Sequence, residues 1–206
     1  MTRRIIALSG FAGVGKDTIA SHLSKVYGYK RLSFASSLKD CVSNITGWNR
    51  EKLEGISLED REWRETKDEW WSEKLKRDIS PRTFLTMLGT DIIRKEIPDI
   101  WLLSLERKLS LDTTSNIVIT DCRFNNEIHF LKNKFDASHI RVSREEPGWS
   151  EYEFPTPPLY IHQSEYEWLI DFDGRQKNFE YVFNNIHDVN SPEFERSVER
   201  MINKLQ

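Results

Sequence analysis

The fold is decided near the start of the chain by the stretch Ile5-Ile6-Ala7-Leu8-Ser9-Gly10-Phe11-Ala12-Gly13-Val14-Gly15-Lys16-Asp17-Thr18. Its apolar beginning predicts a buried strand, and the residues after it are apolar at helical spacing up to Gly28. Between the two, Gly10 and the pair Gly15-Lys16 stand at the spacing of a Walker A motif. Glycines allow several backbone N–H groups to point at phosphate oxygens, and the lysine adds a positive charge. The stretch therefore predicts a phosphate-binding loop between a strand and a helix.

One position of this loop departs from the usual motif. A Ser or Thr directly after the lysine normally ligates magnesium, whereas this chain has Asp17 there and a hydroxyl one place later, on Thr18. Because Mg²⁺ usually retains several waters, Asp17 could hold the ion through water. The sequence predicts the phosphate cradle directly and leaves the mode of metal binding open.

The composition of the chain narrows its class. With 206 residues, 38% of them hydrophobic, it can form one sizeable core, and we expect a single domain with an appended lid or insertion. A net charge of −3 argues against a general nucleic-acid binder. No apolar run approaches the roughly 18 residues of a membrane span, and the N-terminus does not resemble a signal peptide. Cys41 and Cys122 lack metal-site spacing, so we expect a reduced, cytoplasmic protein.

Predicted strands alternate with predicted helices along the rest of the chain, which indicates an α/β fold with a parallel sheet. In such sheets ligands bind outside the carboxyl ends of the strands, so residues directly after strands are expected to converge there. The predicted strands after the first are residues 29–34, 116–121, 139–143 and 179–183. The predicted helices are capped by Ser36 or Ser37, by Ser80 before Pro81, by Asn125 and by Ser191 before Pro192, and one more opens at Asp99.

Two stretches do not fit this alternation, and one helix carries an unexpected glycine. Residues 49–78 are predicted as a mixture of helix and loop, and residues 144–175 as irregular. Gly89 interrupts an apolar helical face, where glycine costs about 1 kcal/mol against alanine. Close approach of a ligand or of another helix would explain it.

A phosphate loop alone would also serve a GTPase, and two short patterns test that alternative. Asn133-Lys134-Phe135-Asp136 matches the NKxD motif for guanine, and Asp171-Phe172-Asp173-Gly174 matches DxxG. NKxD should follow a buried strand but here follows a helical run, and DxxG should precede NKxD but comes after it. We interpret both matches as accidental.

A kinase needs, in addition, cationic groups that hold an acceptor and bridge its charge to the donor phosphates, and arginine suits this task. The candidate arginines are Arg61, Arg64, Arg82, Arg123 and Arg144. Any one of them alone is better interpreted as a solvated surface charge. Arg123 is the exception, because it follows Asp121 at the end of a predicted strand.

Several further short motifs follow one another along the chain. They are the Gly15-Lys16-Asp17-Thr18 ending of the loop, Phe34 through Leu38-Lys39-Asp40, the arginine-tryptophan cluster near Arg61, Leu88-Gly89-Thr90-Asp91 followed by Trp101, and Thr120-Asp121-Cys122-Arg123-Phe124-Asn125-Asn126-Glu127, with His162-Gln163-Ser164-Glu165 and Asn184-Asn185 as weaker members. In this set, which is spread over most of its length, the chain resembles the bacteriophage-type deoxynucleoside monophosphate kinases, a family of P-loop nucleotide kinases. Asp17 is itself a feature of that family.

The resemblance implies a three-layer P-loop kinase fold and the ATP-dependent phosphorylation of a deoxynucleoside monophosphate, with magnesium as the metal. Lys16, Arg82 and Arg123 would be the catalytic residues. The metal would be held, mostly through water, by Asp17, Thr18 and Asp121. The residues implied in ATP binding are Gly13, Val14, Gly15, Lys16, Asp17, Thr18, Arg144 and Asn185.

The resemblance also implies an acceptor-binding helical region at about residues 36–110, a lid at about 144–175, and a homodimer. The residues implied in binding the deoxynucleoside monophosphate are Phe34, Leu38, Lys39, Arg61, Arg82, Gly89, Thr90, Asp91, Trp101, Asp121, Arg123 and Glu127. The expected partners are small nucleotides, with neither nucleic acid nor membrane.

Two other functions remain open from the sequence. Because Gly-Lys-Asp-Thr does not specify the acceptor, the chain could be a kinase for another small molecule. From a different class, it could be a nucleotide-binding regulator that uses the aromatic and charged residues 49–78 as a partner surface. An assay with a panel of candidate acceptors would distinguish the first alternative from a deoxynucleoside monophosphate kinase. Nucleotide binding without turnover would favour the second alternative.

Overall fold

The computed structural model describes residues 3–112, 115–144, 163–170 and 179–205. The chain divides into two compact units, and each is described by itself. One, the sheet unit, comprises Met1–Ser33 and Leu111–Gln206, and the other, the helical unit, comprises Phe34–Ser110.

The sheet unit is built on five parallel strands in the order β2-β3-β1-β4-β5. β1 lies at the centre, with Ile6 opposite Val118 of β3 on one side and Ser138 of β4 on the other. The elements are β1 (Ile5–Ser9), α1 (Lys16–Tyr27), β2 (Lys30–Leu32), β3 (Ile117–Ile119), α7 (Asn125–Phe135), β4 (Ser138–Ser143), η4 (Gln163–Glu165), η5 (Glu167–Leu169), β5 (Tyr181–Asn184) and α8 (Pro192–Lys204).

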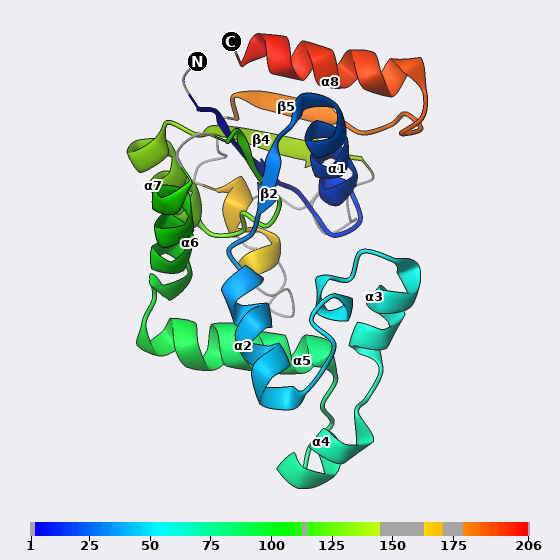
Figure 1. Cartoon of the computed structure of the whole chain (residues 1–206), viewed down its shortest axis with the longest axis vertical. Coiled ribbons are helices and arrows are strands. Elements are labelled where there is room, and N and C mark those ends of the chain that lie inside the picture. The colour runs from blue at the N-terminus through cyan, green and yellow to red at the C-terminus, as the bar shows by residue number, and fades with distance from the viewer. Residues whose placement is uncertain (1–2, 113–114, 145–162, 171–178, 206) are drawn as a thin grey trace. The chain divides into compact units, whose positions relative to one another are not determined.

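Helices cover both faces of this sheet. Every residue of β1 and of β3 is buried, as expected of parallel strands between two layers of helices. Figure 1 shows α7 on one side of the strands and α1 on the other. α8 packs against both β5 and α1, because Phe194 meets Phe183 and His22 there. The predicted α/β class with a parallel sheet between helices is confirmed.

Several element boundaries differ from the sequence prediction. The second and third strands are shorter than expected, because β2 and β3 pair with each other only over Lys30–Leu32 and Ile117–Ile119. The last strand is Tyr181–Asn184, the segment that pairs with β4. The prediction that Asn125 caps its helix is wrong, since Phe124 stands at the cap position and its N–H donates to a carboxylate oxygen of Glu127, at 3.1 Å. The predicted cap at Ser36 or Ser37 is also wrong, since Ala35 stands at that position.

The helical unit contains the predicted helices from the middle of the chain. Ser80 begins one of them as predicted, since its Oγ accepts from the N–H of Thr83 and Pro81 follows at the first helical position. Its elements are α2 (Ser36–Thr46), η1 (Lys52–Glu54), α3 (Leu58–Glu65), α4 (Glu69–Leu75), α5 (Pro81–Thr86), the π-helix η2 (Met87–Arg94) and α6 (Ile100–Leu111).

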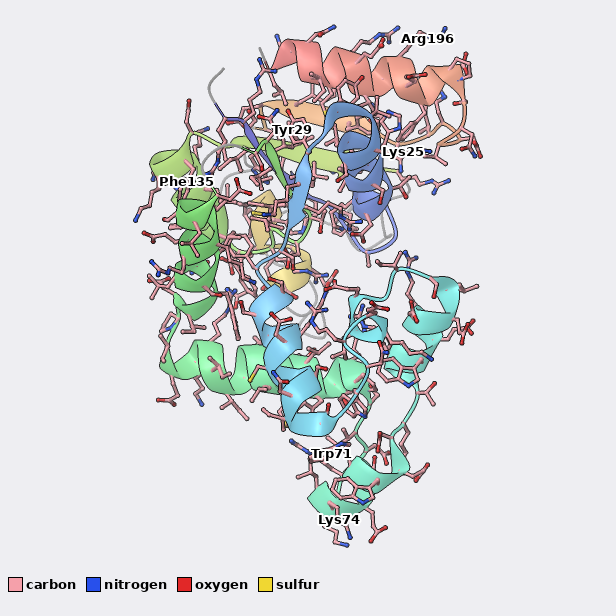
Figure 2. All side chains as sticks on the ribbon, viewed as in Figure 1. Lys25, Tyr29, Trp71, Lys74, Phe135 and Arg196 are labelled. Atoms are coloured by element: carbon pink, nitrogen blue, oxygen red, sulfur yellow. The ribbon has the colours of Figure 1, made fainter. Side chains whose placement is uncertain are left out.

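Aromatic side chains fill the part of the helical unit's core that residues 49–78 help to form. Trp48, buried, makes edge-to-face contacts with Trp63, Trp71 and Phe84, and its indole N–H donates to a carboxylate oxygen of Asp68 at 2.8 Å. Figure 2 shows Trp71 on α4 together with Lys74. Trp63 and Trp71 of this segment therefore serve packing in the first place, whereas Trp70 is exposed.

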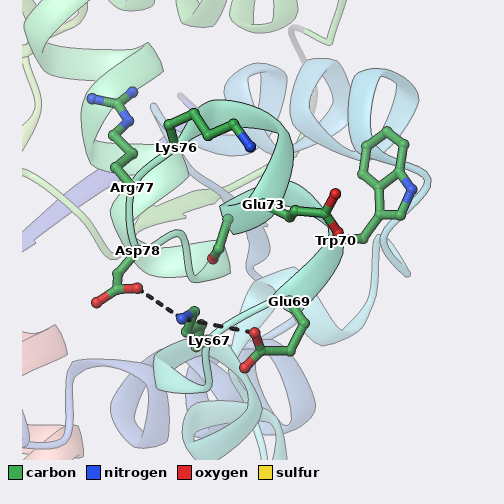
Figure 3. Close-up of a pocket in the computed structure, with 8 residues that line it drawn as sticks. Lys67, Glu69, Trp70, Glu73, Lys76, Arg77 and Asp78 are labelled. Carbon is green, nitrogen blue, oxygen red and sulfur yellow. Dashed lines mark ion pairs between the residues drawn. The ribbon is translucent and has the colours of Figure 1, made fainter.

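An open depression of about 650 Å³ lies around α4. Figure 3 shows the amino group of Lys67 between Asp78, with which it pairs at 2.9 Å, and Glu69, with which it pairs at 3.7 Å. All three side chains are largely exposed, and the lining contains no predicted site residue.

Among the described residues, no helix is long and apolar enough to cross a membrane.

Candidate functional site

The phosphate loop connects β1 to α1 and leaves no room for side chains at two glycines. A Cβ on Gly10 would lie 2.4 Å from the carbonyl oxygen of Val142, and one on Gly15 would lie 2.2 Å from Nδ2 of Asn185. Gly15 also has a φ of +94°, in the left-handed region that favours glycine. The loop residues Ala12 and Gly13 are exposed. The backbone is thus curled and open at the N-terminus of α1, which is the form of an anion cradle.

Lys16 begins α1 and folds back over its own loop. Its Nζ donates to the carbonyl oxygens of Gly10, at 2.7 Å, and Phe11, at 2.8 Å. Burial of the ammonium group, and next the positive charge of Arg123, lower its pKa from 10.5 to about 8, although Asp17, Glu165 and Asp121 act in the opposite direction. A buried cation beside a second cation fits a triphosphate, whose negative charge would stabilise the protonated form.

The residues predicted to hold magnesium have other partners. Asp17 forms an ion pair with Arg31 of β2, which also donates to Ser21 on the next turn of α1. Asp121 accepts a hydrogen bond from Ser33 at 2.8 Å. Among the described residues, no group of three or more His, Cys, Asp or Glu side chains could hold a metal. This sparse donor set fits Mg²⁺, which is commonly bound by one or two carboxylates, several waters and substrate phosphates.

Arg123 lies beyond the end of β3 and faces the same loop. Its guanidinium pairs with Glu165 of η4 at 2.7 Å, and both side chains are about one-third exposed. Its charge acts on Lys16, as do those of Glu165 and Asp121. The fold therefore brings the residues after β1 and β3 together, as the chain order predicted.

The segment that carries Glu165 is anchored beneath the loop. Trp168 of η5 is 1% exposed, and its ring meets that of Phe11 edge-to-face, with centroids 5.1 Å apart. Its indole N–H donates to the carbonyl oxygen of Glu165, and Glu167 accepts from the N–H of Asn125 at 2.8 Å. These contacts fix η4 and η5 against the phosphate loop and the start of α7.

The predicted ATP-binding residues at the other strand ends differ in their surroundings. Asn185, after β5, is 5% exposed, and its side-chain amide donates to the carbonyl oxygen of Val14 at 2.7 Å. It therefore braces the phosphate loop from inside. Arg144, after β4, is exposed. Most of the predicted lid, including His162, lies outside the described residues.

In the helical unit, the basic residues predicted to bind the acceptor are engaged with neighbouring groups. Lys39 is paired with Glu54, which Arg50 also contacts, and these two cations lower the Glu54 pKa against the effect of burial. Arg61 donates to the carbonyl oxygen of Gly55 at 3.0 Å. Arg82 forms an ion pair with Glu65. The arginines of this unit thus connect α3 to its neighbours.

The other predicted acceptor residues lie around the π-helix. Phe34, Leu38 and Trp101 are buried in the helical unit, whereas Thr90 is half-buried and Asp91 exposed. A Cβ on Gly89 would lie 2.4 Å from Cδ2 of Leu38, so another helix, α2, makes the close approach there. The carbonyl oxygen of Gly89 accepts from the Trp101 indole at 3.1 Å.

Some groups near the site were not anticipated. Arg31 was predicted only as part of a strand, and nothing in its spacing from Asp17 indicated the ion pair. The buried His139 of β4, whose Nε2 lies 2.7 Å from Oγ of Ser9, was likewise taken only as a strand residue. His139 stands in the sequence next to the apolar Ile140, and β4 also contains Ser138, Arg141 and Ser143, so no local pattern singled it out.

A five-stranded parallel sheet with a phosphate loop between its first strand and first helix defines a P-loop protein. No protein-family model matches the chain. It is 30% identical over 159 residues, 70% of its length, to an Acanthamoeba polyphaga mimivirus protein that is by name a deoxynucleotide monophosphate kinase, and it covers 75% of that protein. The chain belongs to the deoxynucleotide monophosphate kinase family.

A second relative and several solved structures are similar over different extents. The deoxynucleoside-5'-monophosphate kinase of Escherichia phage T5 is 38% identical over 68 residues, 32% of this chain and 27% of that protein. A sugar kinase from Janibacter sp. HTCC2649 matches with a TM-score of 0.48 at 16% identity, over 100% of this chain and 95% of its own. The shikimate kinase of Bacteroides thetaiotaomicron matches with a TM-score of 0.47 at 12% identity, over 98% of each chain. Likeness at this level carries no information on substrate.

Proposed function

We propose that the protein transfers the γ-phosphoryl group of ATP to a deoxynucleoside monophosphate, which yields ADP and the deoxynucleoside diphosphate. The observation that carries the proposal is the pairing of the phosphate loop with two cations, Lys16 and Arg123, whose charges act on each other within one unit. Family membership supplies the class of acceptor.

In this proposal the loop amides and Lys16 hold the outer phosphates of the donor. Arg123 leaves Glu165 and spans the phosphate that is transferred and the phosphate that accepts it. Because the acceptor is already an anionic phosphate, no strong general base is needed, and transfer is direct, without a covalent enzyme intermediate. Bound Mg²⁺ would neutralise charge on the outer phosphates, and Asp17, Thr18 and Asp121 would hold it mostly through water.

The helical unit is proposed to recognise the acceptor nucleotide. Lys39, Arg61 and Arg82 are its candidate phosphate ligands, and each would exchange a present partner for phosphate oxygens. Thr90 and Asp91, on the π-helix, are candidates for the sugar or base. π-helical turns open the backbone ladder and are frequent at functional sites, which favours a role for this one.

Further parts of the proposal follow from the family. The partners are small nucleotides, without nucleic acid or membrane, and the protein forms a homodimer. With viral relatives, its place of action would be the cytoplasm of a host cell.

The test is a coupled assay of ADP release with purified protein, ATP, Mg²⁺ and each deoxynucleoside monophosphate in turn. We expect turnover with at least one of them, and loss of turnover in a folded Lys16→Ala variant. If no monophosphate is phosphorylated, the proposal fails. Turnover with another small acceptor would then support the second kinase function, and tight ATP binding without any turnover would support a regulator.

A further inference from the structure

The peptide group between Cys122 and Arg123 is held at both of its ends by buried side chains. Its carbonyl oxygen, on Cys122, accepts from Oγ of Ser9 at 2.8 Å. Its N–H, on Arg123, donates to Oε2 of Glu127 at 2.8 Å. Ser9 is fully buried and Glu127 is 2% exposed, so water does not compete strongly for either bond.

A third residue, His139, completes this arrangement behind Ser9. Its Nε2 lies 2.7 Å from Oγ of Ser9, and its side chain is 3% exposed. The single hydroxyl proton of Ser9 is directed at the carbonyl of Cys122, which can only accept. The hydroxyl must therefore accept from His139, so that Nε2 carries a proton. His139 thereby orients Ser9, and Ser9 orients the peptide.

The consequence concerns Arg123, whose Cα is attached to this peptide plane. A fixed plane limits the rotation of the backbone at Arg123 and hence the region its guanidinium can reach. Ser9 is also the last residue of β1, directly before the phosphate loop. The same hydroxyl therefore ties the start of the loop to the backbone that carries Arg123.

We propose that Ser9 and His139 are positioning residues that, together with Glu127, hold Arg123 in register with the phosphate loop. This rests on the proposed function only in that the aligned arginine is taken to act on phosphate. The three residues come from β1, β4 and α7, so the clamp joins three elements of the sheet unit to one peptide group.

The decisive experiment is a double-mutant cycle on kcat. Ser9→Ala is expected to lower kcat about tenfold in the wild-type background, as losing one positioning hydrogen bond commonly does. It should have less than a twofold effect in the Arg123→Ala background, because the residue it positions is gone. Equal losses in both backgrounds would overturn the proposal. Ser9→Thr, which keeps the hydroxyl, should restore most of the activity.

Two matched variants separate positioning from general destabilisation. Ser72→Ala removes a comparable buried hydroxyl, which bonds both backbone groups of Ile79 in the helical unit, and should leave kcat within twofold. His139→Phe keeps an aromatic ring beside Phe179 and removes the donor, and should reproduce the kcat loss of Ser9→Ala.

A second readout does not depend on kinase turnover. The ¹⁵Nε resonance of Arg123, assigned with the Arg123→Ala variant, should shift or broaden in Ser9→Ala and His139→Phe but not in Ser72→Ala. An unchanged resonance in folded Ser9→Ala and His139→Phe would refute the clamp even if the enzyme is active. If the wild type phosphorylates nothing, the proposed function fails while this measurement still decides the positioning claim.

Discussion

Lys16 is a buried cation at the phosphate loop, where a bound phosphate would stabilise its charged form. Its ammonium group bonds two carbonyl oxygens of its own loop, and burial together with Arg123 lowers its pKa to about 8. Lysine binds phosphate as a compact charge only when it is protonated. The protonation of this one side chain therefore couples nucleotide binding to pH.

We predict that ATP affinity falls as pH rises above 8. Below the free-protein pKa Lys16 is already charged, whereas above it binding must take up a proton, which gives a loss of roughly eightfold between pH 7.5 and 9. Calorimetric titration with an ATP analogue in two buffers of different ionisation enthalpy measures both affinity and proton uptake. Lys16→Arg, which stays charged, should bind with the same affinity at both pH values, and a wild type that also does so would refute the prediction.

The same pKa has the opposite consequence for folding. Between pH 8 and 10.5 the unfolded chain binds a proton on Lys16 that the nucleotide-free native state does not. The contribution of Lys16 to the free energy of unfolding therefore rises with pH in that window. Nucleotide binding and stability of the free protein should thus change in opposite directions there.

Arg123→Ala is predicted to lower kcat by about 30- to 1,000-fold, equivalent to roughly 2–4 kcal/mol of lost transition-state stabilisation. The reason is that a guanidinium spanning the transferred and accepting phosphates offsets charge that develops between them. Steady-state kinetics measures the loss, and a thermal melt checks that the variant is folded. If only the melting temperature falls, Arg123 is structural.

Glu165 competes with phosphate for Arg123, and we expect Glu165→Gln to lower KM for the monophosphate by up to about fivefold. The pair is partly exposed, and such pairs contribute at most about 1 kcal/mol. Glu193→Gln removes a similar partner, from Arg196 on α8, and should leave KM unchanged. A higher KM in Glu165→Gln would mean that the carboxylate itself contacts the substrate.

At the scale of elements, the contact between α2 and the π-helix decides the identity of residue 89. Gly89 is buried against Leu38, and any Cβ would collide with that side chain. Its carbonyl is meanwhile used by Trp101. The glycine thus allows two helices to approach closely, at the cost of weaker helix propensity.

We predict that Gly89→Ala lowers the free energy of unfolding by about 1–2 kcal/mol, because overpacking outweighs the gain in helix propensity. In the Leu38→Ala background, where a cavity replaces the leucine, the same substitution should be neutral or stabilising. Urea denaturation of the four proteins measures this change of sign. The same loss in both backgrounds would exclude the Leu38 contact as the cause.

At the scale of the whole molecule, the two compact units carry different parts of the proposed reaction. The phosphate loop and Arg123 belong to the sheet unit, whereas Lys39, Arg61 and Arg82 belong to the helical unit. If each unit binds its own ligand, each ligand should stabilise a different set of backbone amides.

Hydrogen exchange tests this division directly. An ATP analogue with Mg²⁺ should slow exchange at residues 10–18 and 121–123, and a deoxynucleoside monophosphate should slow it within residues 34–39 and 88–94. Lys16→Ala should abolish the first effect and keep the second. A monophosphate that leaves the helical unit unchanged would place acceptor binding elsewhere.

Much of the architecture could be predicted from the sequence because its signals are local. The strand, glycine turn, lysine and helix of residues 5–28 lie within one continuous stretch, and Ser80-Pro81 and Ser191-Pro192 begin helices as their residue types require. The lengths of β2 and β3 could not be predicted in the same way, since a strand extends only as far as its neighbour pairs with it.

The sequence by itself determined the phosphate loop and the alternation of strands and helices, because spacing and residue type suffice for these, and its ordered set of motifs indicated the kinase family through resemblance. Only the tertiary structure decided that Asp17 pairs with Arg31, that Asn185 braces Val14, and that Ser9 and His139 reach the peptide before Arg123. Each of the latter joins residues that are far apart in the sequence or belong to different elements. Such pairs depend on the order and register of the parallel strands, which no local pattern encodes.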